Sequence, residues 1–239
     1  ILGCFQIIDS EGEDITSYFT PTISQIFLLI LFSTIKNGKG ISSQELTDIL
    51  WYDKDNDSAR NNRNVNISKL RLYLKKVGDI ELLNSNNYWA ITLEHGISCD
   101  YKKAIVLAEM VNKMEVFKPE VVTKLLDVAG RGVLLPNFQA DWIDSYKASY
   151  TNLIVDTLVD LTHKKEVKAD SVLLLRIADV ILLYDIIDED AARLKAYVLF
   201  NLGKKGQAKQ CYVKFVEDYK AMLGAEYKTS FDQFREFEF

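Results

Sequence analysis

The segment from Ser58 to Gly78 contains the residues best suited to binding a charged partner. It has six basic residues and no acidic residue. Asparagines crowd its first half, at Asn61, Asn62, Asn64 and Asn66. Cationic side chains bind phosphates, and an asparagine amide can both donate to and accept from the edge of adenine. This combination indicates a nucleic acid as the partner.

Winding this segment as a helix, at about 100° per residue, separates its side chains into faces. An apolar stripe, which we expect to face a core, consists of Ala59, Ile67, Leu70, Leu74 and Val77. A neighbouring stripe without acids consists of Asn62, Val65, Asn66, Lys69 and Tyr73. From it we predict four residues that contact bases in the major groove of DNA, namely Asn62, Val65, Asn66 and Lys69. Asparagine would read adenine, valine would touch a thymine methyl group, and lysine would reach guanine or phosphate.

The basic residues around this stripe are predicted to contact DNA phosphates: Arg60, Arg63, Arg71, Lys75 and Lys76. Arg63 is unusual because it falls on the apolar stripe. Its stem can lie over the core while its guanidinium emerges near DNA or an acidic neighbour. Two plainer interpretations stay open: a basic run is often a solvated helix face, and asparagines are poor helix formers that fray a first turn.

The elements expected around this helix follow the order of a winged helix. In chain order they are short strands within residues 1–20, helices over residues 21–36, 43–51 and 58–77, and a hairpin of strands 80–83 and 88–93. Ser42 and Glu45 have the spacing of a capping box for the second helix. The tip of the hairpin, the wing, would carry Asn84, Asn86 and Asn87.

From Cys99 onward the apolar residues recur at helical spacing. We expect helices near residues 100–114, 119–130, 137–163, 170–184, 188–202 and 205–223. Small and aromatic residues such as Ala196, Ala208 and Phe215 have the spacing of a tetratricopeptide unit. Plain antiparallel helix packing explains the helices before residue 165 equally well. The expected fold is thus an α+β winged helix with a small sheet and a wing hairpin in residues 1–98, followed by an all-α tetratricopeptide-like domain in residues 99–239.

The run Ala59–Arg71, preceded by Glu45-Leu46 and Leu50-Trp51, resembles the DNA-binding domain of OmpR/PhoB-type regulators. It is most similar to the version in Streptomyces antibiotic regulatory proteins. The resemblance implies that the third helix enters the major groove through the same four residues and that the wing lies near the minor groove. It also implies that the loop 52–57 faces RNA polymerase through its three acids, Asp53, Asp55 and Asp57.

Residues 188–231 resemble the bacterial transcriptional activator domain, which is tetratricopeptide-like and follows such a winged helix directly. The resemblance rests on Ala196-Tyr197, Leu202-Gly203, Ala208 and Tyr212. The asparagine-rich helix start and Tyr88-Trp89 look most like regulators from the Bacteroides group.

Enzymatic chemistry finds little support in the sequence. The two histidines, His95 and His163, have no cysteine or carboxylate at triad or ligand spacing, and Gly130-Arg131-Gly132 lacks the pattern of a phosphate loop. The three cysteines are too far apart for a zinc site or a disulfide framework. We therefore expect a protein that is not an enzyme and needs no metal or cofactor.

Length and composition complete the expectation. The chain has 239 residues, 48% of them hydrophobic and 26% charged, and it lacks an apolar run near the roughly 20 residues of a membrane span. We expect a cytoplasmic transcription regulator, or the cytoplasmic part of a longer protein. Its partners would be double-stranded DNA, RNA polymerase, and a second copy or another protein bound by the helical domain. The net charge of −5 keeps an alternative open: a helical interaction scaffold whose winged helix no longer binds DNA.

Overall fold

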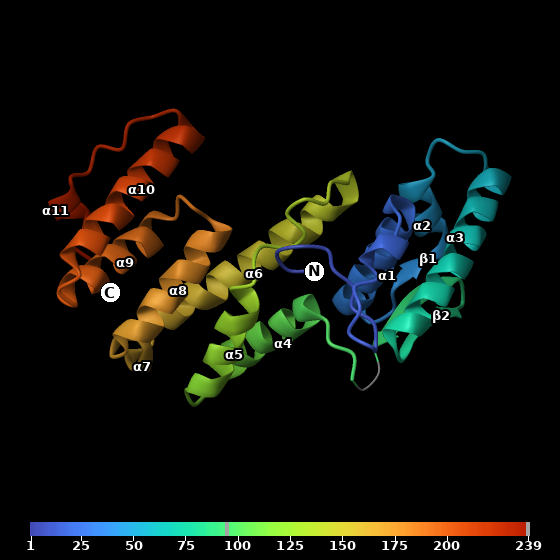
Figure 1. The fold of residues 1–239 in the computed structure, drawn as a ribbon, viewed down its shortest axis with the longest axis horizontal. Helices are drawn as coiled ribbons and strands as arrows, with labels where there is room; N and C mark the ends of the chain where they lie inside the picture. Colours follow the sequence, from blue (N-terminus) through green and yellow to red (C-terminus); the bar gives the residue numbers. More distant parts are fainter. Residues whose placement is uncertain (94–95, 238–239) are drawn as a thin grey trace. The chain divides into compact units, whose positions relative to one another are not determined.

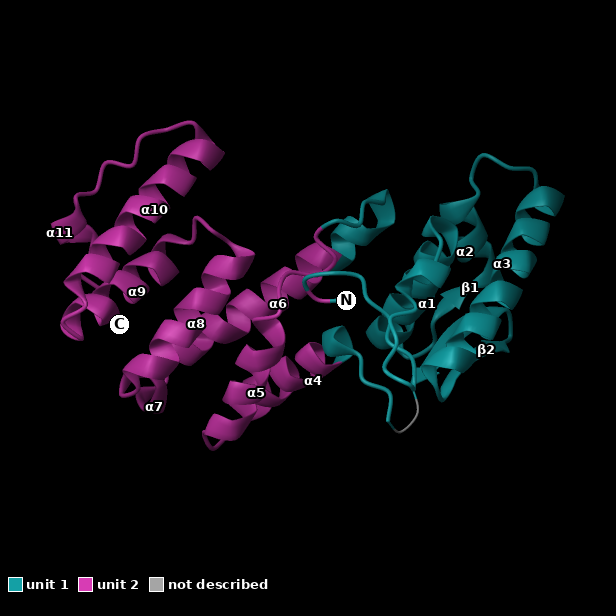
Figure 2. Ribbon diagram, viewed as in Figure 1, with its two compact units in different colours: residues 1, 3–102, 137–146 teal, residues 2, 103–136, 147–239 magenta. Residues whose placement is uncertain are grey.

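The computed structural model describes residues 1–93 and 96–237, and its contacts divide the chain into two compact units (Figure 2). Unit 1 comprises residues 1, 3–102 and 137–146, and unit 2 comprises residues 2, 103–136 and 147–239. The domain boundary after residue 98 stays a prediction. The sequence did not indicate that residues 137–146 would pack with residues 3–102.

Unit 1 has three helices followed by an antiparallel hairpin (Figure 1). These elements are α1 (Pro21–Asn37), β1 (Ile41–Ser42), α2 (Ser43–Leu50), α3 (Asn56–Val77), β2 (Ile80–Ser85) and β3 (Tyr88–Leu93). The three strands form one sheet in the order β1-β3-β2. α1 is the central core helix, buried from Ile26 to Ser33, and it packs against α2, α3 and β3.

The predicted N-terminal strands are wrong. The described part of residues 1–20 makes only two isolated bridges, Ile8 with Asp14 and Leu2 with Leu134, and a short 3₁₀ helix, Thr16–Tyr18. The carboxylate of Asp9 accepts hydrogen bonds from the backbone N–H groups of Glu11 and Glu13, both at 2.9 Å. This side chain closes a tight turn. The pairing beyond the turn stops at Ile7, because its N–H donates to the hydroxyl of Thr16 at 2.9 Å and the 3₁₀ helix begins there.

The hairpin and α2 form where local signals predicted them. Ser42 and Glu45 make the capping box, and its hydrogen bonds hold the pKa of the Glu45 carboxyl below its usual value. The hairpin turns through two residues, Asn86 and Asn87, whose φ angles of 51° and 64° lie in the left-handed region that asparagine tolerates. Asn84 lies in β2 opposite Trp89, not in the turn.

Unit 2 is built from helices. In chain order they are α4 (Asp100–Lys113), α5 (Pro119–Ala129), α6 (Asp144–Thr162), α7 (Lys165–Lys168), α8 (Ser171–Tyr184), α9 (Glu189–Asn201), α10 (Lys205–Leu223) and α11 (Phe231–Phe234). The first three residues of both α4 and α6 belong to unit 1. α9 packs against both α8 and α10, and the buried residues Ala192, Ala196 and Ala208 let these helices approach closely. Among the described residues, no helix has the length and apolar character needed to cross a bilayer.

The helix predicted over residues 137–163 begins only at Asp144, because the residues before it cover an aromatic surface of unit 1. The ring of Phe138 lies 6.4 Å from that of Phe5, and the ring of Trp142 lies 6.4 Å from that of Phe32. The hydroxyls of Tyr146 and Ser33 are 3.2 Å apart. Burying these rings favours an extended segment and a short 3₁₀ turn over one more turn of helix.

Candidate nucleic-acid interface

Helix α3 is fixed at its start by a cap and along one side by the core. The carboxylate of Asp55 accepts a hydrogen bond from the backbone N–H of Ser58 at 2.9 Å, and this bond lowers the pKa of the carboxyl. Four apolar residues of the predicted core stripe are buried: Ala59, Ile67, Leu70 and Leu74. The other sides of the helix therefore face away from the core.

The four predicted base-contacting residues lie on one side of α3, but they differ in exposure. Val65 is 55% exposed and Lys69 is exposed. Asn62 and Asn66 are half-buried, and their amides donate to the carbonyls of Ser58 and Asn62, at 2.8 and 2.9 Å. The side chain of each asparagine thus lies along α3, and its NH₂ group already donates one hydrogen bond to the helix backbone.

The C-terminal end of this stripe is covered. Tyr73 stacks on Tyr18 with ring centroids 5.6 Å apart and lies 6.0 Å from Phe19. The 3₁₀ turn therefore occupies the space beside Tyr73, and the open part of the stripe ends before it.

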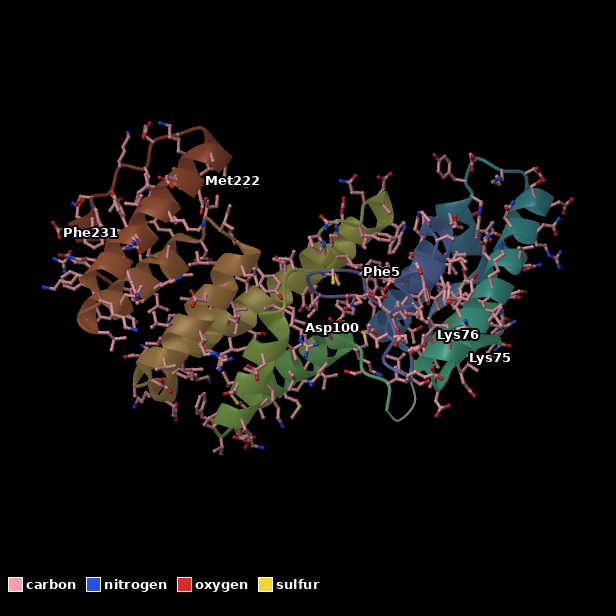
Figure 3. The ribbon with its side chains drawn as sticks, in the orientation of Figure 1. Phe5, Lys75, Lys76, Asp100, Met222 and Phe231 are labelled. Atoms are coloured by element: carbon pink, nitrogen blue, oxygen red, sulfur yellow. The ribbon has the colours of Figure 1, made fainter. Side chains whose placement is uncertain are left out.

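Four of the five predicted phosphate contacts are exposed on α3: Arg60, Arg71, Lys75 and Lys76. Lys75 and Lys76 lie at the C-terminal end of the helix (Figure 3). The ammonium of Lys76 lies 4.6 Å from the ring centroid of Tyr18, and the guanidinium of Arg71 lies 5.3 Å from that of Trp89. Stacking on rings orients these cations without neutralising them.

Arg63 does not point into solvent, because its guanidinium binds helix α2. Its Nη1 donates to the carbonyl of Ser43 and to the hydroxyl of Thr47, both at 3.0 Å, and so joins α3 to α2. Burial and the nearby charge of Arg60 lower the pKa of the Arg63 guanidinium, and its buried Nε has no partner among the described residues. We therefore leave Arg63 out of the proposed phosphate contacts. The helical spacing of the sequence placed Arg63 on the core side of α3. On that side its guanidinium binds Ser43 and Thr47 of α2.

Ser43 ties the tip of the hairpin to the start of α2. Its backbone N–H donates to the carbonyl of Asn87 at 2.7 Å, and its hydroxyl accepts from the indole of Trp89 at 2.9 Å. The approach is close because Gly40 has no side chain: a Cβ there would lie 1.9 Å from the carbonyl oxygen of Trp89. The predicted wing residues Asn86 and Asn87 are exposed at a tip that is held against the helices.

All three predicted acids are exposed, but only Asp53 lies in the loop before α3, since Asp55 is the N-cap of that helix and Asp57 lies in its first turn. Asp55 is committed to capping α3, whereas no such bond is described for the other two. Tyr52 beside them is 86% exposed. A partner of this loop would meet a tyrosine and two uncommitted carboxylates.

Sequence reasoning missed two features of this surface. Leu72 is 60% exposed and lies two helical turns beyond Val65, which their seven-residue spacing could have indicated. Trp89 supports Arg71 through a contact between distant parts of the chain, for which the sequence carries no signal. His95 lies outside the described residues, and no group of side chains among the described ones is arranged to hold a metal ion.

Unit 2 has a groove between α8, α9 and α10, with a hollow of about 220 Å³. Its apolar lining includes Leu183, Ile186 and Phe215. An ion pair of 2.6 Å between Lys195 and Asp179 lies at the same groove. The groove thus combines an apolar surface with charges.

A solved structure with the same fold is Mycobacterium tuberculosis EmbR in complex with a low-affinity phosphopeptide. The likeness has a TM-score of 0.57 at 12% sequence identity, and it covers 94% of this chain and 60% of that one. At this identity the likeness shows the fold alone. No protein-family model and no curated protein sequence matches the chain.

Proposed function

We propose that this protein is a transcription regulator that binds double-stranded DNA through α3. The observation that carries the proposal is the charge of this helix: after Asp57 in its first turn it has five exposed cations and no further acid, and one of its sides is buried. The cations are Arg60, Lys69, Arg71, Lys75 and Lys76. The major groove admits an α-helix, and cations at its borders meet phosphates. The fold shared with EmbR and the resemblance to OmpR/PhoB-type regulators support the same conclusion.

Base reading is assigned to Asn62, Val65, Asn66 and Lys69, with phosphate contact by the other cations. The test begins with selection of a binding site for the full chain from random DNA duplexes. Asn66→Ala should then relax the preference at one base position by about 1–3 kcal/mol. Lys75→Ala should weaken binding to all sequences alike. If the chain selects no sequence and binds no duplex at low salt, the alternative, a helical scaffold with an inactive winged helix, replaces this proposal.

The loop 52–57 is proposed to face RNA polymerase, because its free acids repel DNA phosphates and suit a basic protein surface. Asp55 must be kept in the test, since it caps α3. The double variant Asp53→Ala, Asp57→Ala should bind the selected duplex as the parent does and lower transcription in a reconstituted assay. Unchanged transcription would remove the polymerase role.

The tetratricopeptide-like helices are proposed to mediate assembly or the binding of a protein partner through the α8–α10 groove. Ile186→Glu places a charge in the apolar lining, where Ile186 is 43% exposed. Val172→Glu is the matched control, because Val172 lies on α8 outside the lining and is 67% exposed. Only Ile186→Glu should shorten the footprint on a duplex with two half-sites or abolish partner binding. Equal behaviour of both variants would remove the groove from the proposal.

A further inference from the structure

One line of exposed residues on α3 points directly away from the buried stripe. The residues are Asn61, Val65, Ser68 and Leu72, which follow each other at intervals of four, three and four residues. This spacing keeps side chains on one side of a helix. Val65 and Leu72 are 55% and 60% exposed, so the line contains two open apolar side chains.

Cations border this line on both sides. Lys69 and Arg71 directly precede and follow the buried Leu70, so they point about 100° to either side of it. Lys76 lies on the same side as Lys69, and Lys75 lies on the same side as Arg71. The arrangement of an uncharged line between two basic rows matches the major groove, where base edges lie between two phosphate strands.

A single exposed leucine on a protein surface needs no special explanation. Here two of the four side chains on the line that would lie deepest in the groove are apolar, and they cannot form hydrogen bonds with the polar edges of bases as Asn61 and Ser68 can. The apolar group that the major groove offers is the C5 methyl group of thymine. From this chemistry we infer that Val65 and Leu72 each contact a thymine methyl group and make the protein selective for two thymines. The inference rests on the proposed binding of DNA and deepens it.

The spacing of the two thymines follows from helix geometry. Seven residues advance an α-helix by about 10.5 Å, and successive base pairs are about 3.4 Å apart. The two methyl groups should therefore lie about three base pairs apart. Near the C-terminal end of α3, Tyr73 is covered by Tyr18 and cannot reach a base. Leu72 is exposed there and would make the base contact instead.

The test uses the full chain and duplexes recovered from the selection experiment. Each thymine of the selected site is replaced in turn by deoxyuridine, which removes the methyl group and keeps the base pair. Affinity at constant salt should fall about fourfold at two positions about three base pairs apart, as expected for one buried methyl group. Replacement elsewhere in the site should have little effect.

Variants assign each methyl group to its residue. Val65→Ala should lose the sensitivity to deoxyuridine at one position, and Leu72→Ala should lose it at the other. Lys75→Ala is the control, because it should weaken binding and retain both sensitivities. Both apolar residues are exposed, so alanine at either position should leave the fold intact.

The possible outcomes distinguish a failure of the thymine contacts from a failure of DNA binding itself. A selected site in which every deoxyuridine substitution is neutral overturns the inference and leaves DNA recognition standing. The same holds if both alanine variants keep both sensitivities. A chain that binds no duplex at low salt overturns the inference and the proposed function together.

Discussion

The strongest test of the proposed interface is the dependence of DNA affinity on salt. Each phosphate that a cation neutralises releases a counterion, so the logarithm of the association constant falls with the logarithm of salt concentration by about 0.9 per contact. Four exposed cations of α3 are assigned to phosphates: Arg60, Arg71, Lys75 and Lys76. If all four contact phosphates the slope is about −3.6, and affinity falls about 150-fold between 50 and 200 mM salt.

Removing one cation should change this slope by a known amount. In Lys75→Ala we expect a slope of about −2.7, or about a 40-fold loss of affinity over the same range. Lys124→Ala, at an exposed lysine of α5 in unit 2, is the matched control and should keep the parent slope. Fluorescence anisotropy with a labelled duplex at four or more salt concentrations measures all three slopes. A parent slope shallower than about −2, or equal slopes for both variants, would refute the assignment of phosphates to this helix.

Three further predictions concern residues that stabilise the two units. Gly40→Ala should lower the free energy of unfolding by more than about 2 kcal/mol and weaken DNA binding, because its Cβ would overlap the backbone of Trp89; Gly38→Ala, with a positive φ but open space around it, should cost only about 1 kcal/mol in urea unfolding. Arg63→Ala should lower stability by about 1–3 kcal/mol by breaking its bonds to α2, with the salt slope unchanged; a slope reduced by about one would instead make Arg63 a phosphate contact. Burial raises the pKa of the Asp188 carboxyl, so its ionised form costs stability at neutral pH, and this cost disappears as the pH falls through that raised pKa. Asp188→Asn, which keeps a side chain able to cap α9, should therefore be at least as stable as the parent at pH 7, and its advantage should shrink on acidification; a constant difference from pH 7 to pH 4 would contradict this cause.

Local signals in the sequence were sufficient for most helices and for the hairpin. Pro21 and Gly38 mark the ends of α1, the Ser42–Glu45 pair caps α2, and two asparagines supply the left-handed turn between β2 and β3. These features depend on neighbours within a few residues, so the sequence contains their cause. The helical period in α3 also predicted its buried residues, because one side of a helix in a globular protein meets the core.

The same helical period did not decide what each exposed residue of α3 does. Asn62 and Asn66 donate to their own helix, Tyr73 is covered by Tyr18, and Arg63 binds α2. Leu72, by contrast, makes no such contact with the described residues and is exposed to solvent. Tyr73 and Arg63 are held by other elements of the fold, and the helical spacing of a single segment does not show which elements lie beside it.

The sequence by itself determined which segment is cationic, where its helix ends, and which side of it is apolar, since these properties depend on residue type and spacing. The helix begins at Asn56, two residues before the predicted start, because Asp55 caps it. Tertiary structure decided that Tyr18 of the 3₁₀ helix covers Tyr73, that residues 137–146 join unit 1, and that Trp89 supports Arg71. Each of these depends on contacts between residues far apart in the chain. Such contacts form because burying an aromatic ring outweighs a local preference for strand or helix, and only the packed structure specifies which ring is buried against which surface.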